Sequence, residues 1–332
     1  MSLGFLMKLK ILWALYDIEK IYYPILAAIG IPVNVLAIVI LFRGKCGLSK
    51  CVTSYLVAMA AADLLVIILD LILRQIPIVY RIQFTFLFYV RVCNIHAILL
   101  YAATDCSVWF TVTFSFDRFV AICCQKLKVK YCTKKTAVVV VGTVTVLSCL
   151  KNCFWYFLYT RQYTRSNSPW FCFVAIAAYR SLAWAIVELM HYILTPFIPF
   201  VLILLFNAVT VRNIIVASRT RRRLRDRSSG ASHSDPEMVN RRKSMILLFV
   251  ISANFILLWV VFMVCSILKR LDYLSYMYSV PLPTFLPEIG FILQLLSCCT
   301  NTFIYAVTQR KFRQELTNGV KYPLTRMVKL IR

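Results

Sequence analysis

Charged residues are scarce in this sequence, and acidic residues are the scarcest of them. Only 15 % of the 332 residues are charged, and 13 Asp and Glu stand against 38 Lys and Arg. A soluble globular domain contains about 25 % charged and about 45–50 % apolar residues, whereas 61 % of this chain is hydrophobic. The composition therefore excludes an ordinary soluble domain and indicates an integral membrane protein.

Histidines are also few, and spacings typical of catalysis are missing. His96, His191 and His233 are too dispersed along the chain to predict a metal site. No nucleophile stands at a family-typical spacing from a base. We therefore expect no enzyme activity, no catalytic residue and no cofactor, apart from the ion discussed below.

What the chain has instead is a series of long apolar segments. Each is longer than the roughly 20 residues that a helix needs to cross a bilayer. The seven segments are 22–43, 53–74, 92–122, 133–158, 183–216, 244–268 and 284–308. They predict an all-α membrane protein whose seven-transmembrane-helix bundle occupies 22–308. A short extracellular N-terminus, 1–21, would precede the bundle, and an amphipathic helix and tail, 309–332, would follow it.

The basic residues set the expected orientation, because loops rich in Lys and Arg stay on the cytoplasmic side. Most of them fall on one side if the N-terminus is outside, and the loop 218–243 is the most basic. The chain should therefore be a multi-pass protein of the plasma membrane with a cytoplasmic C-terminus. Its net charge of +25 then reflects topology and attraction to membrane lipids, and we expect no nucleic-acid binding.

Two of the 13 cysteines differ from the rest by position. Cys93 begins the third span on the outer side, and Cys172 lies in the outer loop between spans four and five. Both would face an oxidising compartment, where a bond between them would fix that loop over the bundle. Two free thiols are the alternative that position alone leaves open.

An acid and an arginine, Asp117 and Arg118, lie at the opposite end of the third span from Cys93. At the rise of an α-helix the separation is about 37 Å, close to the thickness of a bilayer with its headgroups. Such a pair can be a simple stop signal at the interface or a functional element.

Motifs in six of the spans resemble one known family. They are Gly30-x-x-x-Asn34, Ala60-Ala61-Ala62-Asp63-Leu64, Cys93 with Asp117-Arg118-Phe119, Pro199 with Asn207, Phe255-x-x-x-Trp259, and Asn301-Thr302-Phe303-Ile304-Tyr305 followed by Arg310-Lys311-Phe312-Arg313. In this order they resemble the rhodopsin-like (class A) G-protein-coupled receptors over nearly the whole chain. Within that family they look most like the orphan branch around probable G-protein-coupled receptor 139.

The resemblance implies a receptor that converts binding of an extracellular ligand, a peptide or a small molecule, into activation of a heterotrimeric G protein. Some positions depart from the pattern. Val261 and Thr302 stand where the family has helix-bending prolines, and Phe262 replaces an arginine of the branch. Leu100 stands where amine receptors carry an acid, which disfavours an amine ligand.

Asp63 lies in the middle of its span, where a charge costs several kcal/mol unless it has a partner. The resemblance implies a sodium or water site there. The residues expected to form it are Asp63, Ser107, Ser297, Asn301 and Asn34. A hydrogen-bond network without an ion, or a proton on the acid, are the alternatives.

The resemblance also implies a switch that opens the inner face when span six moves outward. Its residues would be Asp117, Arg118, Phe255, Trp259, Asn301, Tyr305 and Pro199. Without the resemblance, stacked aromatic side chains are more typical of ordinary core packing.

Aromatic and ionisable residues in the outer halves of the spans predict a ligand pocket. Its residues would be Tyr101, Trp184, Glu188, His191, Trp259, Phe262, Glu288 and Gln294. Asp105 should instead point toward spans four and five and find a structural partner there. On the inner side, the expected G-protein contact consists of Arg118, Arg212, Arg219, Arg241, Arg242 and Lys243.

A transporter or channel that uses the intramembrane acids is the alternative function. The sequence shows no internal repeat and no pair of broken spans, which are typical of secondary transporters. A receptor is therefore the favoured interpretation.

Overall fold

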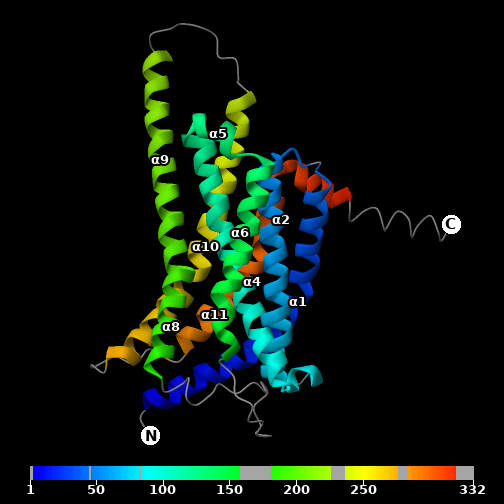
Figure 1. Cartoon of the computed structure of the whole chain (residues 1–332), viewed down its shortest axis with the longest axis vertical. Coiled ribbons are helices and arrows are strands. Elements are labelled where there is room, and N and C mark those ends of the chain that lie inside the picture. The colour runs from blue at the N-terminus through cyan, green and yellow to red at the C-terminus, as the bar shows by residue number, and fades with distance from the viewer. Residues whose placement is uncertain are drawn as a thin grey trace, which may run out of the picture.

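The computed structural model describes residues 3–44, 46–81, 84–157, 181–225, 236–275, 283 and 285–318. Within these ranges the regular structure is entirely helical. Seven helical segments are long and apolar enough to cross a membrane: Lys10–Phe42, Lys50–Tyr80, Arg91–Cys123, Lys134–Phe157, Leu182–Thr220, Met245–Leu271 and Phe285–Thr308. They run side by side along the long axis of the molecule (Figure 1). The predicted seven-helix bundle is confirmed.

The spans are built from the following elements. Spans one to three comprise α1 (Leu3–Phe42), then α2 (Lys50–Val66) with the π-helix η1 (Ile67–Gln75) and α3 (Ile76–Tyr80), then η2 (Thr85–Phe88) and α4 (Val90–Cys123). After α5 (Gln125–Tyr131), span four comprises α6 (Lys134–Asn152) and η3 (Cys153–Phe157). Spans five to seven comprise α8 (Leu182–Tyr192), the π-helix η4 (Ile193–Phe197) and α9 (Ile198–Arg225), then α10 (Pro236–Ser275), then α11 (Phe285–Thr308).

A short helix, 310–318, follows span seven. Its Phe312 side chain is fully buried and makes an edge contact with Tyr305 at a ring distance of 5.9 Å. Arg310, Lys311 and Arg313 are exposed. One apolar and one basic face make this helix amphipathic, as the sequence predicts.

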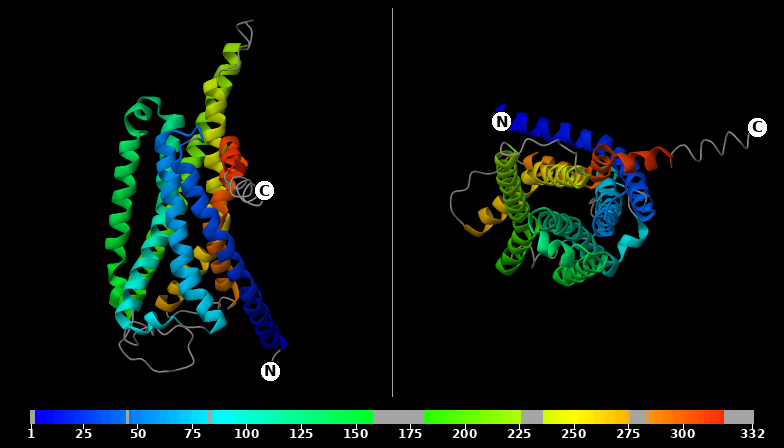
Figure 2. Two further views of the ribbon diagram at one scale, coloured as in Figure 1. Left: turned by 90° about the vertical axis from the view of Figure 1, so that its right-hand side faces the viewer. Right: turned by 90° about the horizontal axis from the view of Figure 1, so that it is seen from above.

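The first helix is longer than the sequence predicts, because α1 begins at Leu3, inside the expected tail 1–21. No proline precedes Pro24, so nothing interrupts the helix. The Tyr16 hydroxyl donates to the Val79 carbonyl at 2.9 Å, and the Tyr80 hydroxyl donates to the Lys20 carbonyl at 2.6 Å. These bonds hold the extension against the Tyr80 end of span two, the end that is called outer here after the orientation expected from the sequence. From there the extension projects beyond the bundle (Figure 2).

The basic loop expected over 218–243 is also partly helical. Span five continues in α9 as far as Arg225, and α10 already begins at Pro236. Both helices extend beyond the other spans at this end of the molecule (Figure 1).

The third span occupies the centre of the bundle, where α4 packs against α2, α6, α9 and α10 (Figure 2). Its Phe114 side chain is fully buried in a core with Tyr55 and Tyr305. Spans six and seven approach each other closely at Gly290, where an added Cβ atom would lie 2.7 Å from the Phe262 backbone nitrogen. Only glycine fits there, because the atom that it faces is backbone.

Candidate functional site

The buried carboxylate of Asp63 lies between spans two, three and seven. The Ser107 hydroxyl donates to Asp63 Oδ1 at 2.5 Å, and Asn301 Nδ2 donates to Asp63 Oδ2 at 2.8 Å. Only 1 % of the Asp63 surface is exposed, so these two neutral donors replace the water that a carboxylate would otherwise bind. Three of the residues expected at an ion site are therefore in direct contact.

The other two residues of the expected site bind elsewhere. Ser297 Oγ donates to the Gln294 carbonyl at 2.6 Å and accepts a hydrogen bond from Trp259 Nε1 at 3.0 Å. Asn34 Nδ2 lies 2.9 Å from the carbonyl oxygens of Gly30 and of Cys298. The Asn34 Oδ1 atom is buried and accepts no hydrogen bond from the described residues.

Stacked aromatic rings connect this region to the outer half of the bundle. The Phe255 and Trp259 rings stack with centroids 5.5 Å apart, and Phe262 meets Trp259 edge-on at 5.9 Å. Through its bond to Ser297, Trp259 thus joins the aromatic stack of span six to the polar residues of span seven.

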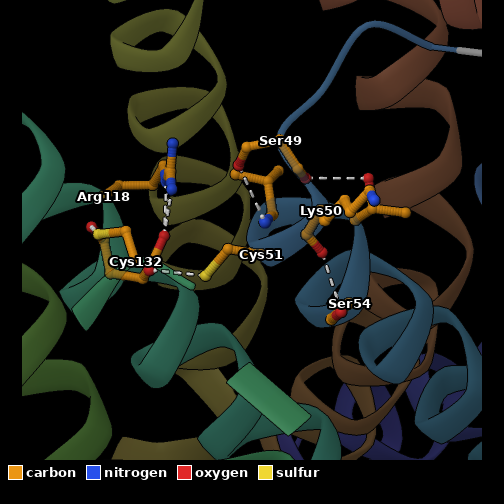
Figure 3. Close-up of polar contacts among 9 residues, drawn as sticks. Ser49, Lys50, Cys51, Ser54, Arg118 and Cys132 are labelled. Carbon is orange, nitrogen blue, oxygen red and sulfur yellow. Dashed lines mark hydrogen bonds and ion pairs between the residues drawn. The ribbon is translucent and has the colours of Figure 1, made fainter. Parts of the chain in front are cut away.

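The acid-arginine pair at the inner end of span three is closed. Arg118 Nε donates to Asp117 Oδ2 at 3.0 Å, and a second guanidinium nitrogen, Nη2, contacts the same oxygen (Figure 3). The Asp117 side chain is fully buried. Two donors from one guanidinium make a strong, oriented pair.

Two cysteines from neighbouring elements surround the pair. The Cys51 thiol, on α2, donates to Asp117 Oδ1 at 3.1 Å. The Cys132 thiol, before α6, donates to the Asp117 carbonyl at 3.6 Å (Figure 3). Burial, followed by the nearby Asp117 carboxylate, raises the pKa of the Cys132 thiol to about 12, so this thiol remains a donor at neutral pH. Neither cysteine stands out in the sequence, where only Cys93 and Cys172 differ from the rest by position.

Tyr305 and Pro199, two further residues of the predicted switch, lie on spans seven and five. The Tyr305 ring is fully buried, and its hydroxyl has no hydrogen-bond partner among the described residues. Pro199 lies just after η4, where the backbone of Thr195 departs from helical geometry with φ −151° and ψ 107°. The irregularity of span five therefore lies before Pro196 and not at Pro199.

An outer cavity of about 400 Å³ opens among spans two, five, six and seven. Phe262 and Glu288 line it, as the sequence predicts. Its other lining residues are Arg74, Gln75, Ile78, Tyr192, Cys265, Ser266, Lys269, Arg270, Pro287 and Phe291. The walls thus combine aromatic rings with three cations and one acid.

Ion pairs hold two of the cavity's cations in place. Arg74 Nη1 lies 3.3 Å from Asp70 Oδ1, one turn earlier in η1. Arg270 forms an ion pair with Glu188, across spans six and five. Glu188 was expected in the pocket, whereas the arginines were missed because basic residues at span ends also serve as simple interfacial anchors.

Three of the expected pocket residues belong to a separate aromatic cluster. Tyr101 stacks on Trp155 at 4.1 Å, and His191 meets both rings edge-on at 5.3 and 5.4 Å. Trp184 packs beside Trp155 at 6.2 Å. None of the four lines the outer cavity. Trp259 and Gln294 are also absent from its walls and are buried below it.

An ion pair lies within the membrane between spans three and four. Lys151 Nζ lies 2.6 Å from Asp105 Oδ2, and Asn152 Nδ2 donates to the same oxygen at 2.5 Å. Lys151 also donates to the Thr195 hydroxyl of span five at 3.2 Å. The expectation that Asp105 finds a structural partner on spans four and five is confirmed, although its cationic partner was missed.

The remaining predicted residues lie at the two ends of the bundle. Arg212 and Arg219 are exposed on α9, while Arg241, Arg242 and Lys243 belong to α10. Cys93 is disulfide-bonded. Cys172 lies outside the described residues, so its pairing with Cys93 stays a prediction.

A comparison with protein families agrees with this arrangement. The model of the family described as 7 transmembrane receptor (rhodopsin family) matches residues 33–305, which include the end of span one, spans two to six and most of span seven. The orphan branch named from the sequence is finer than this match and stays a prediction. Since the match covers well over half of the chain, and seven helices with a closed acid-arginine pair accompany it, the protein belongs to the rhodopsin family of seven-transmembrane receptors.

Proposed function

We propose that the receptor binds an extracellular ligand, a peptide or a small molecule, in the outer cavity and activates a heterotrimeric G protein at its inner end. The observation that carries the proposal is the closed Asp117–Arg118 pair at the inner end of the central helix. A pair that is closed at rest can open when the bundle rearranges, and it then releases a cation toward a partner. This is a two-state element of the kind that signalling requires.

Contacts between the cavity and the inner half support the proposal. Phe262 lines the cavity and touches Trp259, which donates to Ser297. Asn301 lies one turn further inward than Ser297 on α11, and it binds Asp63. A ligand that moves Phe262 therefore presses on an aromatic stack and on a polar network that joins spans two, three and seven.

The proposed orientation has the N-terminus outside and the C-terminus in the cytoplasm. It places the outer cavity toward the extracellular side and the basic ends of α9 and α10 toward the cytoplasm, as the retention of positive loops requires. The family match favours this receptor function over a transporter or channel.

Nucleotide exchange tests the proposed function. Full-length receptor reconstituted with purified heterotrimeric G proteins should accelerate exchange of guanine nucleotide on at least one of them. Empty vesicles and vesicles that hold heat-denatured receptor are the controls. No acceleration on any G-protein class, together with ion or solute flux through the same vesicles, would instead support a transporter.

We further propose that Asp63 binds a sodium ion or a proton in the resting receptor. A carboxylate buried to 99 %, with two neutral donors and no cation bonded to it among the described residues, suits a monovalent cation. Oxygen atoms are the ligands that such ions prefer. The Ser107 hydroxyl oxygen, which already contacts Asp63, would supply one of them. When bound, the ion would neutralise the carboxylate.

Replacing Asp63 by Asn should remove any sodium dependence of nucleotide exchange. The amide keeps the size of the side chain and one acceptor oxygen, and its NH2 group can donate to the Ser107 or Asn301 oxygen, but it carries no charge for a cation. Basal exchange measured in sodium chloride and in potassium chloride should differ for the natural receptor and agree for Asp63→Asn. A difference of the same size in the variant would favour a hydrogen-bond network without an ion.

A further inference from the structure

A second cavity lies on the outside of the bundle at the proposed cytoplasmic end. It has a volume of about 520 Å³ and is formed where α1, α2 and α6 meet. The lining side chains at its apolar part are Leu41, Phe42, Leu48, Val57, Ala58, Val138 and Val141. Phe42 and Val138 are 73 % and 54 % exposed, so the crevice opens toward the surrounding lipid and not toward the centre of the bundle.

Two lysines stand at the rim of this crevice. Lys50 is the first residue of α2, and Lys134 is the first residue of α6. Both are exposed, both line the crevice, and no acidic residue lines it. Neither lysine forms an ion pair with another described residue. The positive ends of the two helices add to the charge of the lysines, and the crevice is therefore electropositive at its rim.

The hydroxyl groups that line the crevice already use their hydrogens within the protein. Thr53 and Ser54 use their hydroxyl hydrogens on the carbonyl oxygens of Ser49 and Lys50, at 3.1 and 2.9 Å. The two ammonium groups are thus the main donors at the rim, and the floor below them is hydrocarbon. The crevice is therefore complementary to a molecule with an anionic head and an apolar tail.

We propose that this crevice binds one phospholipid with an anionic headgroup from the cytoplasmic leaflet. Its phosphate groups lie between Lys50 and Lys134, and an acyl chain lies along Val57, Val138 and Val141. The leaflet rests on the orientation given under the proposed function. Anionic lipids are concentrated in that leaflet, where each nearby basic residue strengthens their attraction. The site differs from general attraction to the basic loops because it requires both the charges and the open crevice.

Native mass spectrometry of the purified full-length receptor tests the proposal. Phosphatidylinositol 4-phosphate is the probe, and phosphatidylcholine with the same acyl chains is the neutral comparison. The affinity for the first bound probe molecule should fall about thirtyfold in the Lys50→Gln/Lys134→Gln variant, because two basic residues are removed. A matched variant, Lys126→Gln/Lys128→Gln, removes the same charge from exposed positions on α5 that do not line the crevice, and it should bind as the natural receptor does.

A second pair of variants distinguishes binding of one lipid in the crevice from general attraction of anionic lipids to the basic surface. Val141→Trp fills the crevice without changing its charge and should also remove the first bound lipid. Val139→Trp places the same ring at a neighbouring position that is 60 % exposed and outside the crevice, and it should leave binding unchanged. Thermal denaturation of each variant checks that it is folded. Equal loss in both lysine variants, unchanged binding in Val141→Trp, or equal binding of phosphatidylcholine would each overturn the proposal. The measurement contains no G protein. Its outcome therefore does not depend on whether the proposed signalling function is correct.

Discussion

Replacing Arg118 by Ala should reduce G-protein activation by roughly two orders of magnitude, because truncating one member of a buried charge pair costs about 2–5 kcal/mol at an interface. In the closed receptor, Arg118 is bonded to Asp117 and is only 8 % exposed. In the active receptor the same guanidinium would meet the G protein at the floor of the opened inner face. Nucleotide exchange measured at equal surface expression is the readout, and the loss should be the same at low and at high salt.

Exposed arginines provide the matched control for Arg118. Arg212 and Arg219 lie on the surface of α9, where charges mainly accelerate the encounter with a partner and are screened by salt. Their double replacement by Ala should lower exchange only in part, and the difference should shrink as the salt concentration rises. Normal exchange in Arg118→Ala would show that the acid-arginine pair is an interfacial anchor and that the proposed mechanism is wrong.

Replacing Lys151 by Ala should lower the stability of the bundle by about 3 kcal/mol, the lower part of the range for breaking a buried ion pair. The variant leaves Asp105, which is 1 % exposed, without its cation. Lys151 retains some access to solvent, with 24 % of its side chain exposed, which is why we expect the lower value. The midpoint of thermal denaturation in a fixed detergent measures the effect.

A double variant distinguishes loss of a charge partner from loss of packing. Asp105→Asn removes the unpaired charge, so Asp105→Asn combined with Lys151→Ala should recover most of the lost stability. Lys135→Ala, at an exposed position on the same helix, should have no effect. If the double variant is as unstable as Lys151→Ala, the pair contributes through packing and not through charge.

The number and type of the spans could be predicted because the thickness of the bilayer fixes the length of each apolar segment. The ends of the helices could not. Hydropathy shows where lipid begins, but α1 continues outward from the bilayer segment, where the Tyr16 hydroxyl donates to the Val79 carbonyl of span two and the Tyr80 hydroxyl of span two donates to the Lys20 carbonyl. Similarly, α9 extends to Arg225 through residues that are too basic to be counted as part of a span.

The polar centres were predicted unequally. Asp63, Ser107 and Asn301 could be grouped from their depth in the membrane, and the structure places them together. The outer cavity was harder, because the π-helices η1 and η4 change the faces on which later side chains point. Arg74, which lies within η1, lines the cavity. Tyr101 and His191 instead pack against Trp155, a residue that the sequence does not single out.

The ion pair between Asp105 and Lys151 also bears on how the chain enters the membrane during synthesis. A lysine or an aspartate within a helix opposes its release from the translocon into lipid by about 2.5–3.5 kcal/mol. Spans three and four each carry one member of this pair, and only α5 and a few further residues separate the two spans. Leaving the translocon as a hairpin would allow the two charges to neutralise each other before they reach hydrocarbon. We therefore expect these two spans to insert as one unit, and the third span to wait beside the translocon until the fourth has been made.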